Sequence, residues 1–258
     1  MISAGLDVGS RTIKLVPFDA VSSSSLITET GANPLRRCRE LISGINYDRM
    51  VVTGYGRHLV APALGGEIVS EIRAFAVGAR FLYPDCRTII DIGGQDCKVI
   101  LLTNEGEVQK FEMNDRCAAG TGKFLEIMAA TLEVNISTLG NLALSASKTV
   151  RINSLCTVFA ESEVVSLIAR GEESGAIALG LHHAIATRIA TMVRRVGIKE
   201  RAVFAGGAAL NPCLYRLLVD NFGVGLTVPP EPQTVGAVGA AILAQNFRTD
   251  IDGIENTK

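Results

Sequence analysis

The sequence has no tryptophan, only three histidines and no CxxC pair among its six cysteines. Six scattered cysteines in 258 residues are too few for a disulfide framework. The sequence also lacks an excess of either charge, since 25 lysines and arginines stand against 26 acidic residues and leave a net charge of −1. This balance gives no electrostatic reason to expect binding to nucleic acid or to an anionic membrane.

Long apolar runs are absent as well. No such run approaches the length of a membrane span, and Asp7 lies where a signal peptide requires its apolar segment. We therefore expect a cytoplasmic protein with no membrane-spanning segment. At 258 residues and 48% hydrophobic composition, the chain is large enough to bury the cores of two lobes.

One segment of the sequence occurs twice. GLDVGSRTIKLV near the N-terminus returns as IIDIGGQDCKVIL, and the repeat aligns residues 84 positions apart: Asp7, Gly9 and Lys14 with Asp91, Gly93 and Lys98. Each copy predicts a strand, a tight turn containing glycine and a second strand. The turn amides can hold phosphate oxygens while the aspartate binds Mg²⁺ through water. Two copies predict two similar lobes with a nucleotide between them.

A third glycine signal lies in RAVFAGGAALNP, residues 201–212. It predicts a buried strand ending at Gly206 and Gly207, where adenine can approach the backbone closely, followed by a helix with Asn211 as N-cap and Pro212 at its first position. Helices predicted over 70–82 and 235–247 carry small residues suited to close crossing. The final helix is therefore expected to return to the first lobe.

The order DVGS, DIGGQD, FAGG resembles the two phosphate motifs and the adenosine motif of the actin, hexokinase and Hsp70 superfamily. The resemblance implies an α/β fold with two actin-like lobes, built from duplicated ribonuclease H-like domains around a nucleotide cleft. We place the first lobe at 1–85 plus a returning helix at 234–258, and the second at 86–233. The sequence has no Rossmann GxGxxG motif. It has no Walker A motif either, because Phe124 follows Lys123 where Ser or Thr is required.

Two cysteines stand out from the others. Cys117 lies in MNDRCAAGTGKFLE, just ahead of a predicted helix, and Cys156 directly precedes a second helix that stops at Gly171. Helix N-termini favour a thiolate and any anionic group that it holds. By contrast, Cys97 and Cys213 lie in apolar runs and are expected to be buried.

Three interpretations of Cys117 and Cys156 compete. A nucleophilic cysteine needs a histidine base, but the sequence offers only His58, His182 and His183, and the last two project about 100° apart on a helix. Structural, buried cysteines are slightly favoured by the residues alone. As metal ligands, two cysteines are half of the four thiolates of an iron–sulfur cluster, which a symmetric dimer would complete.

The combination of DIGGQD, MNDRCAAGTGKF, LCTVFAESE and TGYGR resembles the ATP-dependent activators of 2-hydroxyacyl-CoA dehydratases, in the BadF/BadG/BcrA/BcrD ATPase family, from residue 4 to about 245. This resemblance implies a homodimer that shares one [4Fe–4S] cluster between Cys117 and Cys156 of both subunits. It also implies that the protein accepts an electron from ferredoxin or flavodoxin. ATP hydrolysis would then allow it to transfer this electron to an iron–sulfur dehydratase or reductase. The Ser-rich segment 21–41 is shorter than we expect for the first lobe of this family.

On this basis we assign the site residues. Asp7 and Asp91 would bind Mg²⁺ through water, and Gln95 or Asp96 would position the attacking water. The remaining ATP or ADP contacts are assigned to the turns and to the adenosine motif: Gly9, Ser10, Arg11, Thr12, Lys14, Gly93, Gly94, Lys98, Gly120, Thr121, Gly122, Lys123, Gly206 and Gly207. Lobe closure on ATP would rotate the helices that hold the cluster.

Two other functions remain possible from the sequence. A kinase of the same superfamily, acting on a sugar or a carboxylic acid, would use Asp115 as a base toward a substrate hydroxyl. A sensor or scaffold of the actin type would bind nucleotide with negligible turnover. Intact phosphate motifs in both copies, and no inserted substrate-binding segment between them, favour the activator over both.

Overall fold

The computed structural model describes residues 2–19, 24–154 and 156–246, and the chain divides into two compact units. Unit 1 comprises Met1–Cys86, Leu102–Val108 and Gln233–Lys258, and unit 2 comprises Arg87–Leu101 and Gln109–Pro232. The last part of the helix expected over 234–258, residues 247–258, lies outside the described residues.

The sheet of unit 1 has five strands in the order β3-β2-β1-β4-β5. Strands β1, β2 and β3 form an antiparallel meander, whereas β4 pairs parallel to β1 and β5 parallel to β4. Every residue of β1 is buried because both faces of the strand are covered: Gly5 lies against Ala237 and Ala241, and Leu6 packs in the core with Cys38 and Val60. The strands are β1 (Ser3–Val8), β2 (Thr12–Phe18), β3 (Leu26–Glu29), β4 (Arg49–Thr53) and β5 (Glu67–Ile68).

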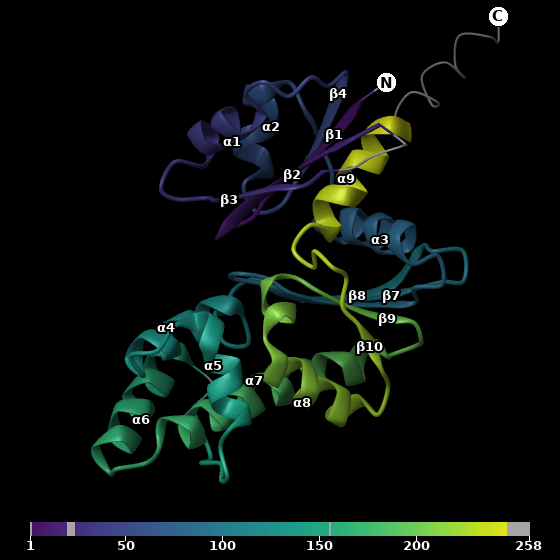
Figure 1. Cartoon of the computed structure of the whole chain (residues 1–258). Coiled ribbons are helices and arrows are strands. Elements are labelled where there is room, and N and C mark those ends of the chain that lie inside the picture. The colour runs from purple at the N-terminus through teal and green to yellow at the C-terminus, as the bar shows by residue number, and fades with distance from the viewer. Residues whose placement is uncertain (1, 20–23, 155, 247–258) are drawn as a thin grey trace, which may run out of the picture. The chain divides into compact units, whose positions relative to one another are not determined.

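Four described helices belong to unit 1: α1 (Pro34–Ile42), α2 (Arg57–Leu64), α3 (Glu71–Leu82) and α9 (Val235–Asn246). The helices predicted over 70–82 and 235–247 are confirmed as α3 and α9. Helix α9 packs closely on α3 and on β1, through glycine and alanine residues on the facing surfaces (Figure 1).

The sheet of unit 2 repeats this arrangement. Its order is β10-β9-β6-β7-β8, with β6 antiparallel to β7 and parallel to β9, and with β10 parallel to β9. Read from the other edge, this is the order of unit 1, so the predicted duplication and the two-lobed α/β fold are confirmed. The strands are β6 (Thr88–Ile92), β7 (Cys97–Leu102), β8 (Val108–Asn114), β9 (Ala202–Ala205) and β10 (Leu226–Thr227).

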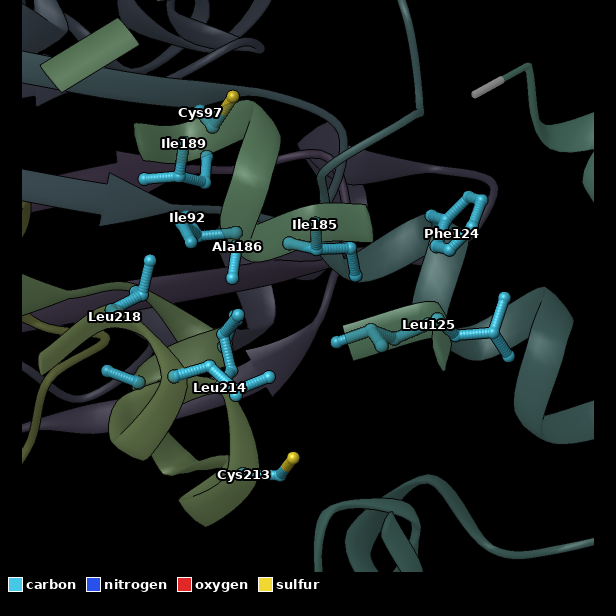
Figure 2. Close-up of a cluster of buried hydrophobic side chains, with 14 of the residues drawn as sticks. Ile92, Cys97, Phe124, Leu125, Ile185, Ala186, Ile189, Cys213, Leu214 and Leu218 are labelled. Atoms are coloured by element: carbon cyan, nitrogen blue, oxygen red, sulfur yellow. The ribbon is translucent and has the colours of Figure 1, made fainter. Parts of the chain in front are cut away.

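The helices of unit 2 enclose its core. They are α4 (Gly122–Thr131), α5 (Ile136–Leu144), α6 (Thr157–Ala169), α7 (Ser174–Val196), a short 3-10 helix η1 (Gly207–Leu210) and α8 (Pro212–Phe222). Figure 2 shows Phe124 of α4, Ile189 of α7 and Leu214 of α8 among the buried side chains. Cys97 and Cys213 are fully buried in this core, as the apolar runs predicted.

Helix α8 begins as the sequence predicts, with Asn211 accepting a hydrogen bond from the Leu214 amide at 3.0 Å and Pro212 at the first position. Helix α7 bears on the expectation that no apolar run approaches the length of a membrane span. In the described part of the chain it is the single helix whose length and composition would suit a membrane span, although 67% of that apolar window is buried within the protein. Its hydrophobicity therefore serves the core of unit 2.

Candidate functional site

The first candidate turn follows β1. Asp7 lies near the end of this strand, 4% exposed, directly across from Lys14 of β2, and the Lys14 ammonium is 3.2 Å from Asp7 Oδ2. The amide of Gly9 donates to the Thr12 carbonyl at 3.1 Å and closes the turn. Within the part of the chain that the structure describes, the amide of Ser10 makes no hydrogen bond. It is available to an oxyanion.

The second turn has the same geometry in unit 2. Asp91 is 2% exposed and lies across from Lys98, whose ammonium is 2.7 Å from Asp91 Oδ2. The Gly93 amide donates to the Asp96 carbonyl at 2.9 Å. Both lysines that we assigned to phosphate are therefore paired with the aspartates, which lowers the charge that each carboxylate presents to a cation. Binding of Mg²⁺ through water fits this pairing better than direct coordination.

The structure separates the two candidates for positioning water. Asp96 forms an ion pair with Lys98, so its carboxylate is occupied. The Gln95 side chain is exposed and makes no hydrogen bond to any described residue. Gln95 is therefore the better placed of the two to orient a water molecule.

A glycine closes each site from a neighbouring strand. Gly54 follows β4 and Gly206 follows β9, and both have positive φ, +90° and +84°. A Cβ on Gly54 would lie 2.5 Å from Asp7 Oδ1, and one on Gly206 would lie 2.6 Å from Asp91 Oδ1. Only glycine fits either position. The TGYGR segment of unit 1 is thus the counterpart of the FAGG segment of unit 2. We did not predict this equivalence from the sequence. The available signal was that each glycine directly follows a strand.

Gly206 is buried against Asp91 and the Ile92 carbonyl, whereas Gly207 is exposed at the start of η1. Of the two adenosine-motif glycines, Gly207 is therefore the one whose backbone a flat ring can approach. Gly206 instead holds the adenosine motif against the second turn.

A residue that the sequence did not point to supports the first turn. Thr30, just after β3, is 4% exposed and donates its hydroxyl to the Gly9 carbonyl at 2.7 Å, while its amide donates to the Arg11 carbonyl at 3.0 Å. Thr30 belongs to the Ser-rich segment 21–41. The sequence hinted at this role only by placing Thr30 directly before a glycine. In the structure this glycine, Gly31, has a positive φ.

Replacing Thr30 by valine should weaken binding of a non-hydrolysable ATP analogue about fivefold, because one hydrogen bond worth about 1 kcal/mol that fixes the Gly9 turn is lost. Isothermal titration calorimetry measures the change. Thr28→Val, on β3, is the matched control and should bind like the wild type. Equal affinity of both variants would show that Thr30 does not support the nucleotide site.

The segment that follows Cys117 is joined directly to the second turn. The amides at the start of α4 donate to that turn, from Gly122 to the Gly93 carbonyl at 2.9 Å and from Lys123 to the Gly94 carbonyl at 2.7 Å. These two amides are therefore not available to phosphate. The amide and the hydroxyl of Thr121 both donate to the Ala118 carbonyl, so among the predicted donors of this loop the buried Gly120 amide and the Lys123 ammonium, 3.5 Å from Glu126, remain.

The duplication shows how this connection differs between the units. The Gly9 carbonyl of unit 1 accepts from Thr30, whereas the equivalent Gly93 carbonyl of unit 2 accepts from Gly122. Asn114 lies 84 positions after Thr30 and donates its side-chain amide to the Cys117 carbonyl at 2.8 Å. In unit 2, the phosphate turn is therefore supported by the start of α4, the helix that follows Cys117.

Cys117 and Cys156 differ from the other cysteines in exposure. Cys117 is half-buried and Cys156 is exposed at the N-cap of α6, whereas the other four are buried. Burial raises the pKa of the Cys38, Cys97 and Cys213 thiols to about 11. Helices α4 and α6, which follow the two accessible cysteines, pack together at one end of unit 2 (Figure 1).

The described residues of one chain contain no group of three or more His, Cys, Asp or Glu side chains able to hold a metal ion. Two accessible thiols fit an iron–sulfur cluster only if a second copy supplies two more. Helix α6 has an uncovered apolar surface beginning two residues after Cys156. It consists of Val158, Phe159, Val165 and Ile168, which are 42–67% exposed.

A buried histidine holds Asn211, the last residue but one of the adenosine motif segment 201–212, in place. His182 is fully buried; its Nδ1 donates to the Ala178 carbonyl at 2.7 Å, and its Nε2 accepts from the side-chain Nδ2 of Asn211 at 2.9 Å. Burial lowers the pKa of His182 below its ordinary value. The ring is therefore neutral, and it orients the residue that caps α8.

This arrangement predicts a pH-dependent stability. The unfolded chain binds a proton at His182 below about pH 6.5 while the folded protein resists it, so stability is present above that pH and falls as pH drops through 6.5. The slope contributed by His182 approaches about 1.4 kcal/mol per pH unit. Urea unfolding between pH 7.5 and 5.5 should show the slope in wild type and in His183→Gln, whose replaced histidine is exposed. It should be reduced in His182→Gln, and an unchanged slope there would contradict the assignment.

The model of the BadF/BadG/BcrA/BcrD ATPase family matches residues 4–244 of the chain. The protein belongs to this family. A 2-hydroxyisocaproyl-CoA dehydratase activator from Clostridioides difficile is 40% identical over 254 residues, with 95% of each chain covered.

Two solved structures share the fold. Component A of (R)-2-hydroxyglutaryl-CoA dehydratase from Acidaminococcus fermentans superposes with a TM-score of 0.89 at 37% identity, covering 96% of this chain and 99% of the other. The activator of 2-hydroxyisocaproyl-CoA dehydratase from Clostridium difficile, with bound ADPNP, gives a TM-score of 0.87 at 38% identity, covering 100% of both chains.

These matches confirm the ATPase interpretation and do not favour the kinase alternative. They also correct one expectation about this member of the BadF/BadG/BcrA/BcrD family. Because 95% of the C. difficile relative is covered, the Ser-rich segment 21–41 does not mark a substantially trimmed first lobe. Its described part contains β3, Thr30 and all of α1 except the last residue, Ile42.

Proposed function

We propose that this ATPase is an electron-transfer activator, which uses ATP hydrolysis to pass a low-potential electron to a 2-hydroxyacyl-CoA dehydratase or a related iron–sulfur reductase. The observation that carries the proposal is the pair of hydrogen bonds from Gly122 and Lys123 to the Gly93–Gly94 turn. They join a candidate phosphate site to the segment of an accessible cysteine. The related activators named above support the class of partner.

In this proposal the nucleotide site uses the residues of both turns. Asp7 and Asp91 hold Mg²⁺ through water, the free turn amides and the exposed Gly207 backbone contact ATP, and Gln95 orients the attacking water. A change of the Gly93–Gly94 turn when the γ-phosphate leaves would reach the start of α4 directly, because the two are hydrogen-bonded.

The cofactor we propose is one [4Fe–4S] cluster per homodimer, held by Cys117 and Cys156 of each subunit. When bound, such a cluster supplies a one-electron carrier whose potential depends on solvent exposure and on hydrogen bonds near its ligands. The Asn114 amide fixes the Cys117 carbonyl, and the uncovered apolar surface of α6 offers a second copy a contact beside Cys156. Helix α4 would transmit movement of the phosphate turn to the Cys117 segment.

The electron donor in this proposal is a ferredoxin or a flavodoxin, and the reaction takes place in the cytoplasm. With a net charge of −1, the chain has no electrostatic reason to bind nucleic acid or membrane. These roles follow from the family resemblance and from the composition.

An anaerobic coupled assay tests the proposed function. The protein, reduced ferredoxin and an inactive 2-hydroxyacyl-CoA dehydratase are combined with ATP or with a non-hydrolysable analogue, and dehydration of the acyl-CoA is followed. We expect the dehydratase to become active with ATP and to stay inactive with the non-hydrolysable analogue. ADP release that instead depends on a sugar or a carboxylic acid, with a phosphorylated product, would replace the proposal by the kinase function.

A further inference from the structure

Unit 2 contains a cavity of about 830 Å³ to which none of the functions above assigns a role. This volume lies within the range of small-molecule sites in proteins. The cavity is bordered by the end of β8, the segment 149–153 and the part of α7 from Gly180 to Arg195. Its lining contains none of the residues assigned to the nucleotide.

The charges around this cavity do not balance. Its charged residues are Glu112, Arg151, Arg188 and Arg195. Arg195 Nη1 is 2.8 Å from Glu112 Oε1, so these two neutralise each other. The side chains of Arg151 and Arg188 make no hydrogen bond or ion pair with any residue that the structure describes. Two guanidinium groups are therefore available at one cavity.

Both arginines sit on supported backbone. Segment 149–153 is attached to α6, since the Asn153 amide and side chain donate to Glu163 at 3.0 Å and 2.9 Å. Arg188 lies on the long helix α7, and its stem covers the Gly120 turn, where a Cβ would come within 2.8 Å of Arg188 Cδ. Supported arginines lose less conformational freedom when they bind a ligand.

The rest of the lining suits a small organic molecule. Val150, Ile152, Ala184 and Met192 give one apolar part, and Asn114 and His183 give polar groups. Guanidinium groups bind carboxylates and phosphates with two parallel hydrogen bonds, and two unneutralised arginines match a ligand with two negative charges.

We propose that this cavity binds a small organic dianion, a phosphate monoester or a dicarboxylate, through Arg151 and Arg188. The bound anion would lie next to the Cys117 segment, because Asn114 contacts the Cys117 carbonyl and Arg188 covers Gly120. This proposal does not depend on the electron-transfer function.

Calorimetric titration at low ionic strength tests it, with the protein first saturated with a non-hydrolysable ATP analogue and Mg²⁺, so that the γ-phosphate position of the nucleotide site is filled and does not take up the probe. Inorganic phosphate and succinate are the two probes, and the one that binds more tightly identifies the class of anion. We expect saturable binding of one anion per chain. Arg151→Gln and Arg188→Gln should each weaken it roughly tenfold, because each removes a charged hydrogen-bonding partner.

The control is Arg170→Gln, an exposed arginine at the end of α6 outside the cavity, which should bind the anion like the wild type. Absence of saturable binding of both probes, or equal weakening in Arg170→Gln, would overturn the proposal. ADP affinity reports whether each variant is folded. If Arg188→Gln loses it, through its contact with Gly120, the exposed Arg151→Gln decides the outcome alone.

Discussion

The Cys156→Ser variant, purified anaerobically, is expected to contain no iron or acid-labile sulfide, whereas the wild type should contain about four of each per dimer. Cys156 is exposed at the N-cap of α6, and the homodimer would supply four thiolates in total from Cys117 and Cys156. Replacing Cys156 leaves two of the four, with a hydroxyl group in place of each lost thiolate. Chemical iron and sulfide analysis, together with the visible absorption spectrum, measures the result.

Cys213→Ala provides the matched control. Cys213 is fully buried in the core of unit 2, so its replacement should leave the iron content unchanged while lowering stability modestly. Wild-type protein that holds no iron after anaerobic reconstitution would assign Cys117 and Cys156 a structural role, and the kinase alternative would then need a direct test.

The Gln95→Ala variant is expected to hydrolyse ATP at least about 100-fold more slowly while binding the nucleotide as well as the wild type. The Gln95 side chain is exposed and has no partner among the described residues, so its loss removes the group that orients water and disturbs no packing. Steady-state phosphate release and calorimetry with a non-hydrolysable analogue measure the two quantities separately.

Gln109→Ala, an exposed glutamine of β8, is the control for this prediction and should hydrolyse ATP at the wild-type rate. Unchanged turnover in Gln95→Ala would reject the assignment and move attention to Asp96. That outcome would be unexpected, because Asp96 is engaged by Lys98.

Some features of the site follow from the sequence because they are local. Asp7 and Lys14 are seven positions apart on two strands joined by a tight turn, so the repeat by itself places them opposite each other, and the same holds for Asp91 and Lys98. The apolar residues at matching places in the two copies predict strands on either side of each turn, and Asn211 with Pro212 predicts the start of α8. The site roles that we assign to these residues stay predictions.

Other features required distant parts of the chain to be brought together. The equivalence of Gly54 and Gly206 depends on β4 and β9 pairing parallel with β1 and β6, which no local pattern specifies. The role of Thr30 depends on β3 ending beside the Gly9 turn, and the link between Gly122 and Gly93 joins a loop to a helix across two strands.

The sequence by itself therefore determined the duplication, the two turns with their aspartates and lysines, and the two unusual cysteines, since short-range periodicity and turn chemistry encode all of these. The tertiary structure decided which carbonyls and amides those turns use, which cysteines remain accessible, and which arginines share a cavity. The physical reason is that hydrogen-bond partners and burial depend on contacts between residues far apart in the chain, and strand pairing and helix packing create those contacts.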